Sequence, residues 1–181
     1  MRTTFFGYTR PDGSVGVRNY LLLLSGTLYA NGICERSADH LAGAIAITHP
    51  LGRCQVMPDL RLTFRTLVGH GLNPNAGAVI VVDHHRETGC TADEIAHEIA
   101  GSGKPVAAVN IRECDGLLSA EHKVNKLALE FLRKITGQQR EEVGTQHLIL
   151  GLNCGTSDTT SGISSNKATG HCSDLDRKSV V

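Results

Sequence analysis

Short runs of branched apolar residues, separated by stretches with helical spacing, constrain the fold of this chain more than any other feature. The runs lie at 20–24, 44–48, 77–83, 105–109 and 147–150. Short runs rich in Val, Ile and Leu are typical of strands that are buried on both faces. Strands that alternate with helices indicate an α/β fold, with a mostly parallel sheet of about five strands flanked by helices in Rossmann-like layers.

The stretches between these runs carry helix signals. One predicted helix has an apolar face made of Val124, Leu127, Ala128, Phe131 and Ile135. Gly137 is expected to end that helix. Thr91 and Glu94 have the spacing of a capping box that opens a second helix, and Pro58 suits the first turn of a third. A weaker candidate covers about 31–42.

Two segments lie outside this alternating pattern. A Gly-rich arm covers residues 1–19, and a polar tail covers 153–181, so the α/β domain is predicted at 20–152. The alternative, purely structural interpretation of the arm is a turn permitted by glycine that lies against the sheet. The tail is too long for an ordinary closing loop.

Charge and cysteine usage exclude several classes of protein. The chain has 18 Lys and Arg against 18 Asp and Glu, so it offers no general electrostatic reason to bind nucleic acid or an acidic membrane. We expect a cytoplasmic protein, because the sequence shows neither a signal peptide nor an apolar run that could span a bilayer. None of the six cysteines forms a C-x-x-C pair, which argues against a zinc finger, a ferredoxin-type loop and a thioredoxin-like site.

Reactive side chains follow the carboxyl ends of the predicted strands, where ligands bind in open α/β sheets. Five such side chains are His49, Cys54, His84, Cys90 and Cys154. Free cysteines also pack as small apolar residues, and we expect Cys34, on a helix, to do so. His84 and its neighbour His85 should point in different directions, so at most one of them reaches a substrate. The layout is that of an active-site edge.

Nucleotide binding and a serine nucleophile have no motif to support them. The loop after the first strand, Ser25 to Gly32, contains neither G-x-G-x-x-G nor G-x-x-x-x-G-K-[ST]. No G-x-S-x-G elbow occurs, and no cysteine has an obvious local partner base.

Three segments together resemble the altronate/galactarate dehydratase family, which includes the large subunit of sulfolactate sulfo-lyase. They are GYTRPDGSVGVRN from Gly7, THPLGRC from Thr48, and NCGTSD from Asn153 with SGI and Asn166 beyond it. The resemblance runs from about residue 5 to about residue 175. The sequence departs from the family pattern at Arg53, which separates Gly52 from Cys54, and by a longer insertion before Cys90.

The resemblance implies a divalent-metal-dependent lyase, with Fe²⁺, or else Mn²⁺ or Mg²⁺, as cofactor. Such an enzyme removes water from a sugar acid such as altronate or galactarate after abstracting the α-proton. The implied metal ligands are His49, Cys54, Cys90 and Cys154. The implied catalytic residues are His49, His84 and Asp158. The implied substrate-binding residues are Arg10, Arg18, Asn19, Asn153 and Ser157.

Two alternatives stay open at this point. A carbon–sulfur lyase would use the same proton abstraction but release sulfite from sulfolactate, and a fragment without catalysis would act as a partner-binding domain. Family members continue beyond the tail motif, so the resemblance implies that residues 153–181 begin a second half that is missing. It also implies a small carboxylate substrate, a separate small all-β subunit and a homo-oligomer, with no nucleic-acid or membrane partner.

Overall fold

The computed structural model describes residues 4–85, 88–153, 155–156 and 158–178. It divides the chain into two units, Tyr8–Arg140 and a second one formed by Met1–Gly7 with Glu141–Val181. Each unit is considered by itself. The division differs from the predicted boundaries, because most of the Gly-rich arm belongs to the larger unit.

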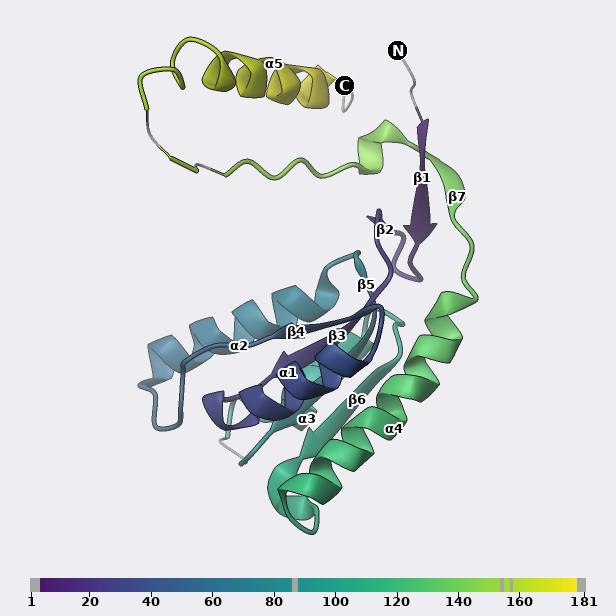
Figure 1. Ribbon diagram of the computed structural model, residues 1–181, viewed down its shortest axis with the longest axis vertical. Coiled ribbons are helices and arrows are strands. Elements are labelled where there is room, and N and C mark those ends of the chain that lie inside the picture. The colour runs from purple at the N-terminus through teal and green to yellow at the C-terminus, as the bar shows by residue number, and fades with distance from the viewer. Residues whose placement is uncertain (1–3, 86–87, 154, 157, 179–181) are drawn as a thin grey trace. The chain divides into compact units, whose positions relative to one another are not determined.

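The larger unit is built on a parallel sheet of four strands (Figure 1). The strands are β3 (Tyr20–Ser25), β4 (Ala44–Ile47), β5 (Ala76–Asp83) and β6 (Val106–Asn110), in the order β4-β3-β5-β6. Every residue of β5 is buried, as its unbroken apolar run predicts. The predicted α/β class is therefore confirmed.

Alternate residues of the central strands serve two separate apolar cores. Leu21, Leu23 and Ile80 belong to one core. Leu22 and Leu24 belong to the other. Because side chains alternate across a strand, each core lies on one face of the sheet, and the same short run of sequence supplies both.

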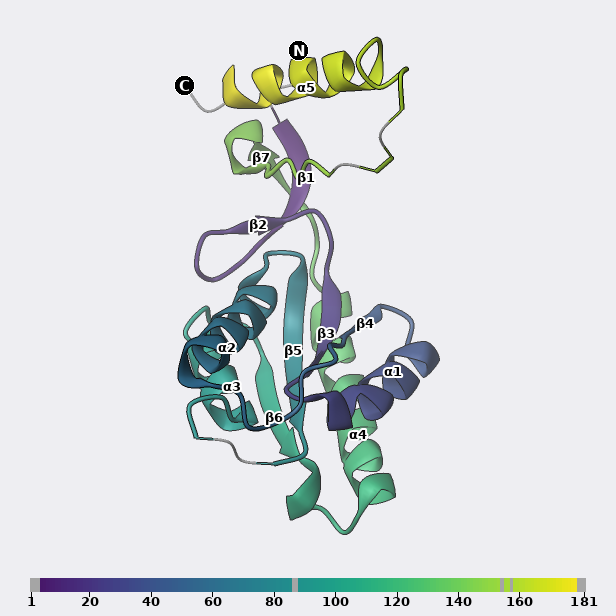
Figure 2. The same cartoon turned by 90° about the vertical axis from the view of Figure 1, so that its left-hand side faces the viewer.

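Helices cover both faces of the sheet (Figure 2). Those on one face are α1 (Asn31–His40), after the 3₁₀ turn η1 (Leu28–Ala30), and α4 (Leu117–Thr136), after the turn η2 (Ile111–Glu113). Those on the other face are α2 (Met57–Leu72) and α3 (Ala92–Ala100).

The sequence signals that start and orient these helices are confirmed. At the start of α3, Thr91 Oγ1 accepts a hydrogen bond from the Glu94 N–H at 3.1 Å, and Glu94 Oε2 accepts one from the Thr91 N–H at 2.8 Å. The buried face of α4 contains Val124, Ala128 and Phe131, as its apolar spacing predicts.

The Gly-rich arm is fastened at the amino ends of the strands. Within the larger unit, Tyr8 and Thr9 of β1 (Thr4–Thr9) pair antiparallel with β2 (Val15–Gly16). The buried Arg10 side chain, 4% exposed, donates hydrogen bonds to Pro74 O at 2.7 Å and to Asn19 Oδ1 at 2.8 Å. The remaining acceptors of the Arg10 guanidinium are Arg18 O and Gln138 Oε1.

One glycine lets the arm lie close against the sheet, and one buried lysine stabilises the end of α2 near it. A Cβ atom at Gly77 would overlap the Asn19 side chain, so glycine is required there. The buried Lys104 ammonium donates to the last carbonyls of α2, those of Gly71, Leu72 and Asn73. Arg10 and Lys104 therefore satisfy backbone carbonyls that regular structure leaves unpaired.

The fifth predicted strand, at 147–150, is wrong. The chain forms the 3₁₀ turn η3 (Thr145–His147) there and then continues without regular structure. In the second unit the strand is instead β7 (Glu141–Gly144), which pairs antiparallel with residues 4–7 of β1. An apolar run becomes a strand only where it finds a hydrogen-bonding neighbour, and Ile149 is 81% exposed.

The second unit ends in helix α5 (Ser165–Lys178). Throughout the described ranges, no helix combines the length and apolar character needed to cross a bilayer.

Candidate active-site edge

The parallel sheet brings four segments, distant in sequence, to one edge. Asp83 and Asn110 are register partners at the carboxyl ends of β5 and β6, and Ser25 pairs with Val82 beside them. The predicted gathering of strand-end loops at one edge is therefore present in the larger unit.

Asp83 is the most unusual residue at this edge. Its side chain is 1% exposed. Oδ1 accepts hydrogen bonds from the His84 N–H at 2.6 Å, from Thr27 Oγ1 at 3.1 Å and from the His85 N–H at 3.3 Å. Oδ2 is buried and has no hydrogen-bond partner among the residues that the structure describes. Burial raises the pKa of this carboxyl group, and the hydrogen bonds to Oδ1 oppose that rise.

Two more buried polar atoms near this edge lack partners within the described ranges. One is His84 Nδ1, whose ring contacts Tyr29 with centroids 5.0 Å apart. The other is Asn31 Oδ1, while the amide nitrogen of Asn31 donates to His49 O at 2.9 Å. Buried polar atoms are nearly always hydrogen-bonded, so such orphans at a sheet's carboxyl edge indicate a place where a ligand or water binds.

His49, predicted as both catalytic residue and metal ligand, uses both of its ring nitrogens within the fold. The Leu51 N–H donates to Nδ1 at 3.2 Å, and Nε2 lies 3.0 Å from Ser25 O. Because Nδ1 accepts, Nε2 carries the proton and donates to the Ser25 carbonyl. Binding a metal or transferring a proton would require one of these hydrogen bonds to break.

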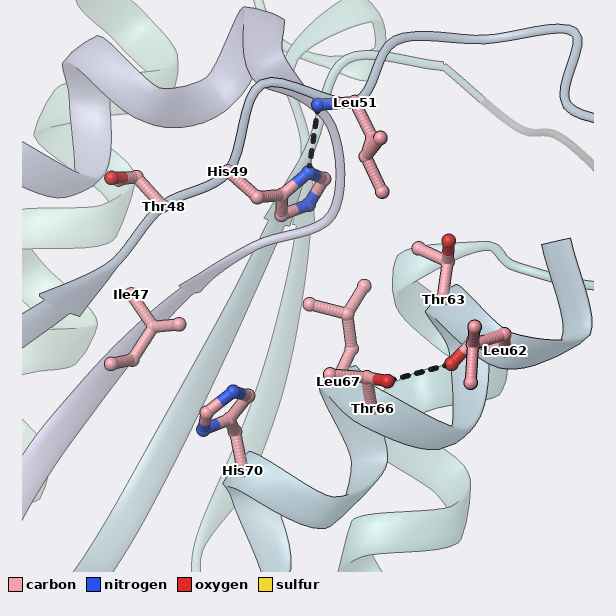
Figure 3. A pocket seen from close by; sticks show the side chains of 9 residues that line it. All are labelled: Ile47, Thr48, His49, Leu51, Leu62, Thr63, Thr66, Leu67 and His70. Atoms are coloured by element: carbon pink, nitrogen blue, oxygen red, sulfur yellow. Dashed lines mark hydrogen bonds between the residues drawn. The ribbon is translucent and has the colours of Figure 1, made fainter. Parts of the chain in front are cut away.

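The ring of His49 also forms part of the wall of a pocket of about 240 Å³ between β4 and α2 (Figure 3). Ile47, Leu62 and Leu67 are among the residues that give this pocket a mainly apolar lining, and His70 reaches into it from α2. An apolar cavity of this kind does not suit a polyhydroxylated acid. The pocket is therefore not our candidate for the substrate site.

The described cysteines among the predicted metal ligands do not belong to a metal-binding cluster. Cys34, as predicted, packs in one apolar core, and burial raises its pKa to about 12. Cys90 is buried in the other core. Cys54 is exposed and adopts the left-handed conformation, with φ of 65°.

Three of the four predicted metal ligands lie among the described residues. Among the residues that the structure describes, no three His, Cys, Asp or Glu side chains lie close enough to hold a metal ion. Both nitrogens of His49 are occupied, and Cys154 lies outside the described residues. His49, Cys54 and Cys90, the described members of the predicted donor set, do not come together around an ion in this arrangement. Metal dependence stays a prediction.

Three of the predicted substrate-binding residues lie at the opposite end of the sheet from Asp83. Arg10 and Asn19 bond to each other and to backbone carbonyls, as described above, and the Asn19 amide also donates to Ile135 O at 2.7 Å. Arg18 is exposed, and its guanidinium donates to Val17 O at 3.3 Å. The structure thus places Arg10 and Asn19 in the clamp that holds the arm.

The other predicted residues lie in the second unit. Asp158 is exposed, and its Oδ1 accepts hydrogen bonds from the N–H groups of Thr160 at 2.7 Å and Ser161 at 2.9 Å. A hydrogen bond from the Thr160 side chain, with these backbone bonds, lowers the pKa of Asp158. Asn153 and Asp158 line a polar hollow of about 760 Å³. Ser157 lies outside the described residues.

The sequence places Asp83 among the polar residues that follow the strand ends but assigns it no role, and it does not single out Asn31. The signal for Asp83 was present, because an acidic residue ends an otherwise apolar strand, AGAVIVVD. Asn31 gave no comparable signal, since its unpartnered oxygen depends on how the turn after β3 folds.

Comparison with known families agrees with this architecture. The family model described as D-galactarate dehydratase/Altronate hydrolase, second domain, matches residues 7–136. The model described as D-galactarate/Altronate dehydratase, C-terminal, matches residues 145–178. The chain therefore belongs to the galactarate/altronate dehydratase family, and the predicted resemblance is confirmed.

Individual relatives include both dehydratases and a sulfo-lyase. The chain is 38% identical to (2R)-sulfolactate sulfo-lyase subunit beta of Chromohalobacter salexigens, covering 94% of this chain and 43% of that protein. It is 29% identical to altronate dehydratase of Bacillus subtilis, covering 94% and 36%. It is also 29% identical to galactarate dehydratase (L-threo-forming) of Escherichia coli, covering 95% and 36%. The chain spans less than half the length of these relatives.

Proposed function

We propose that this chain forms part of a lyase that abstracts the proton α to the carboxylate of a hydroxy acid and expels a group from the neighbouring carbon. The observation that supports it is the buried Oδ2 of Asp83 at the carboxyl edge of the sheet, which has no hydrogen-bond partner among the described residues. A carboxylate whose pKa is raised by burial is a stronger base than an exposed one, which suits it to accept a carbon-bound proton.

The hydrogen bonds at Asp83 assign different tasks to its two oxygens. Oδ1 is held by Thr27 Oγ1 and by the backbone N–H groups of His84 and His85. These contacts fix the orientation of the carboxylate, which leaves Oδ2 as the oxygen that accepts the proton. His84 Nδ1, also unpartnered among the described residues, is the group that would donate a proton to a departing hydroxyl.

The chemistry balances in the following way. The α C–H bond breaks and its proton moves to Asp83, while the electron pair is held by the adjacent carboxylate as an enediolate. That pair then forms the carbon–carbon double bond as the bond to the departing group breaks, and a hydroxyl that receives a proton leaves as water. The resulting enol becomes a keto acid. We also propose that the enzyme depends on a divalent metal, Fe²⁺, Mn²⁺ or Mg²⁺. We further propose that the chain assembles with a separate small subunit of all-β fold or with further copies of itself.

Sulfite is the second candidate for the departing group. It is favoured by the 38% identity to the sulfo-lyase subunit, against 29% for the altronate and galactarate dehydratases named above. Sulfite leaves as an anion with the bonding electron pair, so this reaction needs a proton acceptor but no acid at the leaving group.

Turnover of three acids tests the proposal. Altronate, galactarate and sulfolactate are each incubated anaerobically with the intact protein and Fe²⁺, Mn²⁺ or Mg²⁺, and keto acid and sulfite are measured. We expect keto acid from at least one of them, and a loss of at least about 100-fold in kcat for Asp83→Asn. Asp39→Asn, which changes an exposed acid on α1, is the matched control and should keep full activity. If the protein converts none of the three acids, the proposal is overturned.

A further inference from the structure

Two cationic side chains, Arg53 and Arg112, act on the imidazole of His85 beside Asp83, although the chain as a whole has no net charge. Arg112 Nη1 lies 3.1 Å from His85 Nδ1. Since a guanidinium only donates, His85 Nδ1 accepts this hydrogen bond. Burial lowers the pKa of His85, and the positive charges of Arg53 and Arg112 lower it further.

The fold holds two of these side chains in place. Asp83 and Asn110 are register partners, so the residues that follow them leave adjacent strands side by side. The His85 N–H donates to Asp83 Oδ1 at 3.3 Å, and the Arg112 N–H donates to Asn110 Oδ1 at 2.9 Å. Arg53 comes from the loop that follows β4.

Within the described ranges, neither Arg53 nor Arg112 forms an ion pair with a carboxylate. The two guanidinium charges repel each other, and an anion placed between them removes that repulsion. Asp83 acts on His85 in the opposite sense, and its Oδ1 already accepts hydrogen bonds from backbone N–H groups.

From this juxtaposition we propose that Arg53, His85 and Arg112 form an anion subsite that binds a second acidic group of the substrate, a carboxylate or a sulfonate. The inference rests on the proposed lyase function and specifies its substrate class. The first acidic group lies next to the carbon that loses its proton at Asp83, and the second lies at the far end of the molecule. The subsite therefore selects short hydroxy acids with two negative charges, such as galactarate or sulfolactate, over altronate, which has one.

Binding measured by calorimetry tests the subsite independently of turnover. Galactarate, sulfolactate and altronate are titrated into the wild-type chain, Arg112→Gln, and the control Arg65→Gln, which removes an exposed charge on α2. We expect Arg112→Gln to weaken binding of both diacids roughly ten-fold and that of altronate less than two-fold. Arg65→Gln should change none of the three. Equal weakening of all three acids by Arg112→Gln, or no weakening at all, would overturn the subsite.

A second measurement uses inorganic sulfate as the probe. Histidine ring resonances are followed by NMR across a pH titration with and without sulfate, with His40 on α1 as the internal control. An anion in the subsite stabilises the charged imidazole, so sulfate should raise the pKa of His85 and leave that of His40 unchanged. Equal shifts of both would indicate only general screening and would count against the subsite.

The two proposals fail in different ways. If no acid is turned over but Arg112→Gln selectively weakens diacid binding, the lyase proposal is wrong and the subsite stands. If turnover is observed but Arg112→Gln affects all three acids alike, the lyase stands and the subsite is wrong.

Discussion

At the scale of single residues, the buried carboxylate of Asp83 makes the fold less stable at neutral pH. Burial raises its folded pKa above the ordinary value. Between the unfolded and the folded pKa the native state therefore binds more protons, so the Asp83 contribution to the free energy of unfolding falls as pH rises through that window.

Asp83→Asn tests this cost. Asparagine keeps an oxygen to accept the bonds that Oδ1 receives, but it carries no buried charge. We expect the variant to unfold with a free energy about 1 kcal/mol higher than wild type at pH 7, and the difference to shrink as pH falls toward the ordinary pKa of aspartate. Denaturant titrations across the pH range measure it. If the variant is less stable than wild type at every pH, the buried charge of Asp83 is not what lowers the stability of the fold.

His49 separates a structural role from metal binding. Its two ring nitrogens join the loop after β4 to the end of β3. We expect His49→Ala to lower the free energy of unfolding by about 2 kcal/mol and to leave the bound iron per chain unchanged. Metal analysis and thermal unfolding are run on the same preparation. Loss of iron with unchanged stability would restore the sequence prediction.

Residue roles were harder to infer from sequence than residue positions. Arg10 and Asn19 belong to a family motif, and their polarity suggested contact with substrate. Whether a guanidinium bonds to substrate or to its own backbone depends on acceptors such as Pro74 O and Gln138 Oε1, which are distant in sequence. The predicted catalytic, metal-binding and substrate-binding roles, including those of Cys154 and Ser157, stay predictions.

At the scale of secondary-structure elements, the arm depends on the Arg10 clamp. Replacing Arg10 by Met leaves buried carbonyl oxygens without donors, so we expect the free energy of unfolding to fall by about 3 kcal/mol. The control Arg18→Met, at an exposed guanidinium, should change it by less than about 0.5 kcal/mol. Chemical denaturation gives both values. A stable Arg10→Met variant with weakened substrate binding would instead support the substrate-binding role.

Helix α3 relies on its capping box. Thr91→Ala removes the oxygen that accepts from the Glu94 N–H, so we expect a loss of about 1 kcal/mol in the free energy of unfolding. Thr91→Ser keeps that oxygen and should stay within a few tenths of a kcal/mol of wild type. If both variants lower the free energy of unfolding by the same amount, the hydrogen bond to the Glu94 N–H is not what stabilises the start of α3.

Helices and strands could be predicted from the sequence wherever the pattern that specifies them lies within a short stretch of neighbouring residues. The capping box, the apolar face of α4 and the four strands of the parallel sheet all follow from spacing within a short window. The run at 147–150 has the same local pattern, but forming a strand requires a neighbour, and that information is not local. Strand β7, rich in charge, was missed for the converse reason, since its pairing with β1 stabilises it.

At the scale of the whole molecule, the two units should differ in local stability. Residues 149–153 have no regular structure, whereas β5 is buried throughout and bonded on both sides. We expect amide hydrogens of 149–153 to exchange within seconds and those of β5 to be protected by the global unfolding free energy. Hydrogen-exchange mass spectrometry resolves the two peptides. Slow exchange in both would show that 149–153 is hydrogen-bonded after all.

The alternation of β5 between two cores also constrains how the sequence can change over time. Inserting or deleting one residue within β5 would send every following side chain to the opposite face and exchange the lining of both cores at once. The loops beyond the carboxyl edge have no such register to keep, so their length can vary. A lineage built on this sheet can therefore acquire new specificity by changing the length of its edge loops while the strand that carries Asp83 tolerates only substitution.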